Sequence, residues 1–235
     1  MLRNKLHTIV TGVFLVLEAI LFWFILTTGG QTLVTCEYMA IILCFVYAAL
    51  TCRKHTLLIL AGLAFTLGAD YFLVVANPME QLWGMVFFMG TQTMYAIYLH
   101  LQTRNKILLI SRVTLIVLAE GIAWIVLGDK LDPLAAVSMY YYANLIMNLI
   151  EVFSVFRKER LLSFGFLLFF LCDTVIGLQV AGSGYLAIEE GSLLHQIIFM
   201  PFHLSWFFYL PSQVLIALRS GMPVAPILTK KDSAD

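Results

Sequence analysis

Charged residues are scarce in this sequence. Asp, Glu, Lys and Arg make up 12% of the 235 residues, whereas a typical soluble domain contains roughly 25%. Hydrophobic residues make up 61%, and the mean hydropathy is +0.93. A water-soluble fold cannot bury so much apolar surface, so the composition predicts an all-α protein that crosses a membrane several times.

Common catalytic and ligand-binding motifs are also missing. No Ser-His-Asp order, Gly-x-Ser-x-Gly elbow, phosphate-binding loop or His-Glu-x-x-His is present. The four cysteines form no Cys-x-x-Cys pair, so we interpret them as small, largely apolar membrane residues. Only His203 falls in mid-span, so we expect no metal and no other cofactor. Patches of basic residues lie only in the loops predicted to be cytoplasmic, which gives nucleic-acid binding no support.

Long apolar runs fill most of the chain, and each is near the ~20 residues that a membrane-spanning helix needs. We expect one transmembrane domain over residues 1–218 and a cytoplasmic tail over 219–235. The eight predicted spans are about Thr8–Thr27, Thr32–Thr51, Thr56–Ala76, Gln81–Gln102, Ile107–Leu127, Pro133–Phe156, Leu161–Ala181 and Leu194–Leu218.

The positions of Lys and Arg predict the orientation. Of the 14 such residues, all but Lys130 fall on one side of the predicted spans. This asymmetry predicts eight spans with both termini in the cytoplasm. Arg112 lies within the fifth run, so we expect its side chain to snorkel back to the inner headgroups.

Two carboxylates lie deep in apolar runs within the same sequence frame. Gly62 and Asp70 are separated by seven residues, as are Gly165 and Asp173. An ionisable residue within a membrane span is costly and therefore indicates a functional site. We interpret Asp70 and Asp173 as the catalytic pair, because two carboxylates in a medium of low dielectric constant are expected to share one proton.

The matched aspartates belong to a wider similarity between the halves of the chain. Glu18 corresponds to Glu120, and Arg53-Lys54 to Arg157-Lys158, at nearly the same offset. Corresponding spans run in the same direction, which predicts a parallel four-plus-four repeat rather than an inverted one. Its two units cover about residues 8–103 and 107–218.

Other polar residues fall near the middle or outer half of the spans. They are expected to bind substrate or to position water around the aspartates. These supporting candidates are Glu18, Gln92, Glu120, Tyr140, Asn144, His203, Tyr209 and Gln213.

Several short motifs follow one another along the chain in a fixed order and spacing. They are Gly62…Phe65…Gly68-x-Asp70, Gly84…Phe88…Gly90…Tyr95, Pro133…Val137…Tyr140…Met147, Gly165-x-Leu-Leu-Phe…Asp173 and Tyr209-Leu-Pro-Ser-Gln213. Their order and spacing resemble those of the YhhN family of eight-span membrane proteins, which includes the lysoplasmalogenases. The sequence has Gln92 and Cys172 where family members often carry His and Ser. The resemblance implies hydrolysis of the vinyl-ether bond of a lysophospholipid, giving a fatty aldehyde and a glycerophospho-base.

Three other functions remain open. The acids are also compatible with a lipid-binding or proton-coupled transport protein, with a metal-dependent hydrolase using His203 and Asp173, or with a bundle whose acids only join helices. The expected partners are the lysophospholipid and membrane lipids. The expected location is the plasma membrane of a bacterium.

Overall fold

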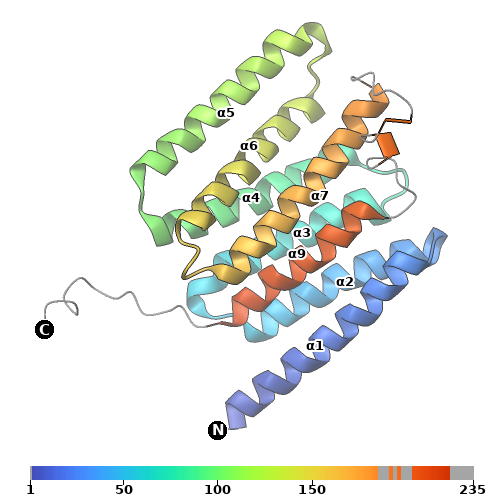
Figure 1. Cartoon of the computed structure of the whole chain (residues 1–235), viewed down its shortest axis with the longest axis vertical. Helices are drawn as coiled ribbons and strands as arrows, with labels where there is room; N and C mark the ends of the chain where they lie inside the picture. Colours follow the sequence, from blue (N-terminus) through green and yellow to red (C-terminus); the bar gives the residue numbers. More distant parts are fainter. Residues whose placement is uncertain (1, 185–190, 193–194, 197–202, 223–235) are drawn as a thin grey trace, which may run out of the picture.

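The computed structural model describes residues 2–184, 191–192, 195–196 and 203–222, and within these ranges all regular secondary structure is helical. Eight α-helices fall in the described part of the chain (Figure 1). They are α1 (Leu2–Thr27), α2 (Gly30–Thr51), α3 (Leu57–Asp70), α4 (Gln81–Thr103), α5 (Lys106–Leu127), α6 (Pro133–Ser154), α7 (Arg160–Gly184) and α9 (Leu204–Gly221).

Five of these segments are long and apolar enough to cross a membrane, namely Lys5–Thr27, Gly30–Thr51, Lys54–Val75, Lys106–Leu127 and Arg160–Val180. Helices α4 and α6 are of similar length, but buried polar residues such as Gln92 and Asn148 make them less apolar. The protein is therefore an all-helical membrane protein. The predicted eighth span falls partly outside the described residues, so the count of eight spans stays a prediction.

The helices lie side by side along a common direction, with α1 and α5 at opposite edges of the bundle (Figure 1). Helix α3 packs closely on α4, α7 on α9, and α4 on α6. Gly221 at the end of α9 lies against Thr51 at the end of α2 and against His7 near the start of α1. These helix termini therefore share one end of the bundle, called the basal end below.

Small residues and caps explain much of the local structure. A β-carbon at Gly62 would lie only 2.2 Å from the Tyr95 ring, so glycine is what lets α3 approach α4 so closely. Asn105 caps α5 by accepting a hydrogen bond from the Ile107 amide at 2.9 Å. Asp132 caps α6 in the same way, and Pro133 follows as the first helical residue.

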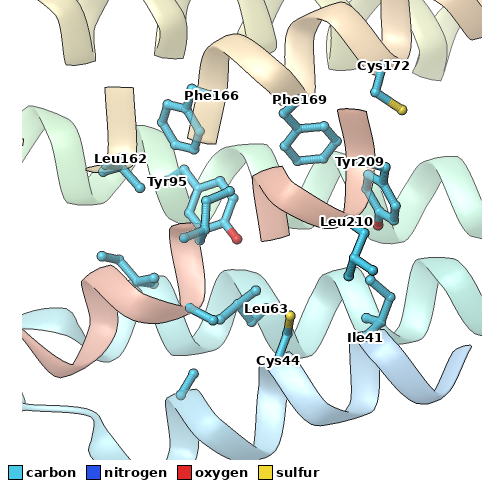
Figure 2. Close-up of a cluster of buried hydrophobic side chains, with 14 of the residues drawn as sticks. Ile41, Cys44, Leu63, Tyr95, Leu162, Phe166, Phe169, Cys172, Tyr209 and Leu210 are labelled. Atoms are coloured by element: carbon cyan, nitrogen blue, oxygen red, sulfur yellow. The ribbon is translucent and has the colours of Figure 1, made fainter. Parts of the chain in front are cut away.

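Aromatic and aliphatic side chains from seven of the described helices, all but α5, form the core, part of which is drawn in Figure 2. Tyr95 and Phe166 are fully buried, with ring centroids 5.2 Å apart. They join the α3–α4 pair to the α7–α9 pair. The core therefore fixes the position of α3 relative to α7, the two helices that carry the candidate aspartates.

Two buried ion pairs tie helices together toward the basal end. Arg219 of α9 pairs with Glu159, which directly precedes α7, and Tyr98 bonds to both partners. Arg112 of α5 pairs with Glu151 of α6 at 2.7 Å. The expectation that Arg112 snorkels to the headgroups is therefore wrong. Arg112 is only 7% exposed, because Glu151 of the neighbouring helix α6 supplies its counter-ion inside the bundle.

Candidate active site

Asp70 is the last residue of α3 and is 3% exposed. The chain continues as a single π-helical turn, Tyr71–Val75, closed by a hydrogen bond from the Ala76 amide to the Tyr71 carbonyl at 2.8 Å. The sequence predicted one uninterrupted helix here. Isolated π-turns are uncommon and occur frequently at functional sites.

Tyr209 of α9 holds the Asp70 carboxylate. Its hydroxyl donates a hydrogen bond to Asp70 Oδ2 at 2.6 Å. The Tyr209 ring is fixed in turn by Trp206, at a centroid distance of 5.0 Å, and by Phe169, at 5.7 Å. Three helices thus determine where this carboxylate lies.

Asp173 of α7 has a matching arrangement built from a different helix. The Tyr141 hydroxyl of α6 donates a very short hydrogen bond to Asp173 Oδ2. The Phe88 ring lies 5.6 Å from the Tyr141 ring and 6.4 Å from the Tyr209 ring. A single aromatic side chain of α4 therefore contacts the tyrosines of both tyrosine–aspartate pairs.

Both aspartates line one cavity of about 110 Å³. Six of the lining residues carry a polar side-chain group, namely Asp70, Cys172, Asp173, Ser205, Trp206 and Tyr209, and the other four are apolar. The full lining is Asp70, Leu73, Val74, Phe88, Cys172, Asp173, Ile176, Ser205, Trp206 and Tyr209. The two aspartates chosen from sequence thus line the same cavity, and their catalytic role stays a prediction.

Of the supporting candidates, Tyr209 lines the cavity and four others bond elsewhere. Glu18 accepts a hydrogen bond from the Cys44 thiol at 3.3 Å, and Gln92 accepts one from Asn148 at 2.8 Å. The Asn144 side chain bonds to Arg112 at 3.0 Å, and the Tyr140 hydroxyl contacts Thr93 at 3.4 Å. These four side chains join neighbouring helices rather than lining the cavity, although Gln92 also interacts with Tyr141, the tyrosine bonded to Asp173.

The last three candidates also lie outside the cavity lining. Glu120 is half-buried on the peripheral helix α5. His203 is the half-buried residue that precedes α9. Gln213 is fully buried in the core, one helical turn beyond Tyr209.

Several site residues were not among the candidates chosen from sequence. Tyr141 lies in a run of three tyrosines, and nothing in that run indicates which hydroxyl points inward. Phe88 and Trp206 belong to apolar stretches and are typical of any membrane helix. Glu37 of α2 is only 7% exposed and interacts electrostatically with Asp70, so it adds a third buried acid nearby.

This arrangement suits acid–base chemistry on a neutral, largely apolar group. Each carboxylate has one oxygen held by a tyrosine hydroxyl, and neither is bonded to a cation among the described residues. Among all residues that the structure describes, no group of three His, Cys, Asp or Glu residues is placed to hold a metal ion.

Comparison with known proteins gives one match. Residues 30–219 match the sequence model of a family described as the YhhN family. No curated protein and no solved structure matches the chain.

Proposed function

The chain belongs to the YhhN family, and we propose that it is a membrane-embedded hydrolase that cleaves the vinyl-ether bond of lysoplasmalogen-type lysolipids. The observation that carries the proposal is the single cavity lined by Asp70 and Asp173, each bonded to a tyrosine hydroxyl. The products are a fatty aldehyde and a glycerophospho-base.

The reaction needs an acid and a positioned water. A protonated carboxyl group adds its proton to the alkene carbon and leaves an oxocarbenium ion. The second carboxylate stabilises this cation and accepts a proton from the water that attacks it. The resulting hemiacetal collapses to aldehyde and alcohol. Two carboxylates divide these roles in the same way in glycoside hydrolysis.

The cavity is too small for a whole lysolipid, so only the reacting segment occupies it. Leu73, Val74 and Ile176 form an apolar wall against which the alkyl chain packs. The headgroup then remains outside, in the polar part of the membrane. The substrate reaches the site from the lipid phase, where a soluble hydrolase has no access.

The direct test is aldehyde release from a vinyl-ether lysolipid by the purified protein in detergent or nanodiscs. We expect Asp70→Asn and Asp173→Asn each to lower turnover at least ~100-fold, the lower end of what one positioned acid or base contributes. Glu80→Gln, which alters an exposed acid before α4, is the matched control and retains activity. If both Asn variants fold and keep wild-type turnover, the proposal is wrong.

A parallel four-plus-four repeat is part of this proposal, with eight spans and both termini on the cytoplasmic side of the bacterial plasma membrane. Support comes from the packing of α3 on α4 and of α7 on α9, which are corresponding pairs in the two units. The two aspartates lie on the corresponding helices α3 and α7. Such a repeat brings equivalent positions together near the middle of the membrane.

A lipid-binding or proton-coupled transport protein is the second candidate. The π-turn after Asp70 and Pro211 within α9 interrupt two helices beside the cavity, and interrupted helices are typical of transporter binding sites. Uptake of intact lysolipid into proteoliposomes along a proton gradient, with no aldehyde formed, supports this candidate over the hydrolase.

A further inference from the structure

Two buried side chains on the basal side of the cavity have polar atoms without partners. Glu18 of α1 is 4% exposed and Gln213 of α9 is 0% exposed. Glu18 Oε2 and both amide atoms of Gln213 have no hydrogen-bond partner among the residues that the structure describes. Each such group destabilises the folded state if it stays unbonded, and native proteins tolerate few of them.

The two side chains approach the same depth in the bundle. Gly221 at the end of α9 lies against Thr51 at the end of α2. At a rise of 1.5 Å per residue, the Gln213 backbone lies about 12 Å above that level and the Cys44 backbone about 10 Å above it. Both helices run toward the basal end, so both side chains lean away from it. Glu18 is bonded to Cys44 and therefore reaches the depth of Gln213.

Cys44 of α2 is the buried neighbour that connects Glu18 to this part of the core. Helix α2 packs on both α1 and α9, and the Cys44 thiol donates to Glu18 Oε1 at 3.3 Å. Figure 2 shows the Cys44 sulfur pointing into the core on the side of Leu63 and Tyr95. Cys44 also interacts electrostatically with Asp70. The Glu18–Cys44 pair is thus a polar group inside the core, within electrostatic range of the aspartate site.

We propose that an internal water molecule binds between the Glu18 carboxyl group and the Gln213 amide, beside Cys44. Water is the ligand that fits, because it both donates and accepts and because a buried water needs two to four polar partners. It bonds to Glu18 Oε2 and to the Gln213 amide, the atoms that otherwise lack partners.

The position suggests what this water does. Gln213 lies one helical turn from Tyr209, which bonds to Asp70. Hydrolysis consumes one water per turnover in a chamber surrounded by lipid. The water bound at Gln213, one turn of α9 from Tyr209, is a store that supplies this reaction. This role rests on the proposed function, whereas the binding of the water does not.

A double-mutant cycle in thermal stability tests the site without any activity assay. Gln213→Met and Glu18→Met each remove one end of the bridge and leave the other end unbonded. We expect each to lower the unfolding midpoint by about 2–4 °C. The double variant removes both polar ends, so its midpoint recovers to within about 1 °C of wild type.

The opposite pattern overturns the proposal. If no water bridges the two groups, the two substitutions act independently, and the shift of the midpoint in the double variant equals the sum of the two single shifts. If neither single variant folds, a double variant that folds supports the bridge and one that does not fold overturns it.

Ser212→Ala is the matched control on the same helix. Its hydroxyl is also buried without a partner, but a helical serine can turn to its own backbone carbonyls. Its midpoint is expected to stay unchanged.

Aldehyde release separates this inference from the proposed function. Gln213→Met is expected to lower kcat several-fold with KM unchanged, because substrate contacts are kept while the water store is lost. If the wild-type protein hydrolyses no vinyl ether, the proposed function fails and the stability cycle alone decides whether the water is bound.

Discussion

Removal of one hydroxyl group, in Tyr209→Phe, is the sharpest test of how the candidate site works. The Tyr209 hydroxyl donates to Asp70 Oδ2 at 2.6 Å, at the short end of the range for O–H···O hydrogen bonds. Phenylalanine keeps the ring and its contacts with Trp206 and Phe169. The substitution therefore removes the hydrogen bond and little else.

The size of the effect follows from the strength of that bond. A hydrogen bond to a charged group contributes about 1.5–3 kcal/mol. If the whole amount is lost in the transition state, kcat/KM falls by about 10–150-fold, since each ~1.4 kcal/mol is a factor of ten. The loss applies whether Asp70 is the acid or the base, because an unheld carboxylate spends less time in the reactive orientation.

The assay is aldehyde release from a vinyl-ether lysolipid, measured well below the unfolding midpoint of the variant. Tyr47→Phe is the matched control, because its hydroxyl also belongs to a buried tyrosine and contacts Thr11 at 3.0 Å, outside the cavity lining. It should stay within about twofold of wild type, since it can lose only a neutral hydrogen bond far from the reacting atoms. Equal losses in both variants, or none in folded Tyr209→Phe, would refute the assigned role of the hydroxyl.

Three further predictions concern stability and topology. Glu159→Gln leaves the buried guanidinium of Arg219 without its carboxylate and should lower the free energy of unfolding by about 3–5 kcal/mol in a denaturation titration; an unchanged value contradicts this. Gly62→Ala places a methyl group against a tyrosine ring and should cost about 1–3 kcal/mol, whereas Gly121→Ala, with nothing within 4 Å, should stabilise by up to ~1 kcal/mol. Lys130→Cys, in a background without the four native cysteines, should react with an impermeant thiol reagent from the outer face only; labelling from the cytoplasmic face reverses the predicted orientation.

Helix boundaries were the most predictable feature of the fold. Apolar run length and charged loops placed most boundaries within a few residues; the fifth run was predicted at Ile107–Leu127 and α5 covers Lys106–Leu127. The third run was predicted as one helix, but the hydrogen bonding changes to a π-turn after Asp70. Amino-acid composition does not predict such a change, because the π-turn residues are as apolar as those of α3.

The candidate site was predictable in its acids but not in their partners. Asp70 and Asp173 are conspicuous because isolated charges in apolar runs are rare. The inward hydroxyl of Tyr141 depends on the rotation of α6 about its axis, which packing against α4 and α7 sets. Sequence spacing alone does not fix that rotation. Arg112 was misplaced for a related reason, since its partner Glu151 lies on a different helix.

The distribution of cations leaves Asp70 and Asp173 without a bonded cation among the described residues, as the proposed reaction of a carboxylate pair requires. A guanidinium beside a carboxylate holds it in the ionised form, and two such pairs would leave no acid to start the reaction. Among the described residues, the two buried arginines, Arg112 and Arg219, are each bonded to a glutamate away from the cavity lining. The groups that hold Asp70 and Asp173 are instead neutral hydroxyls. A hydroxyl orients a carboxyl group whether or not that group carries a proton, so a proton can leave one aspartate and return without the separation of an ion pair.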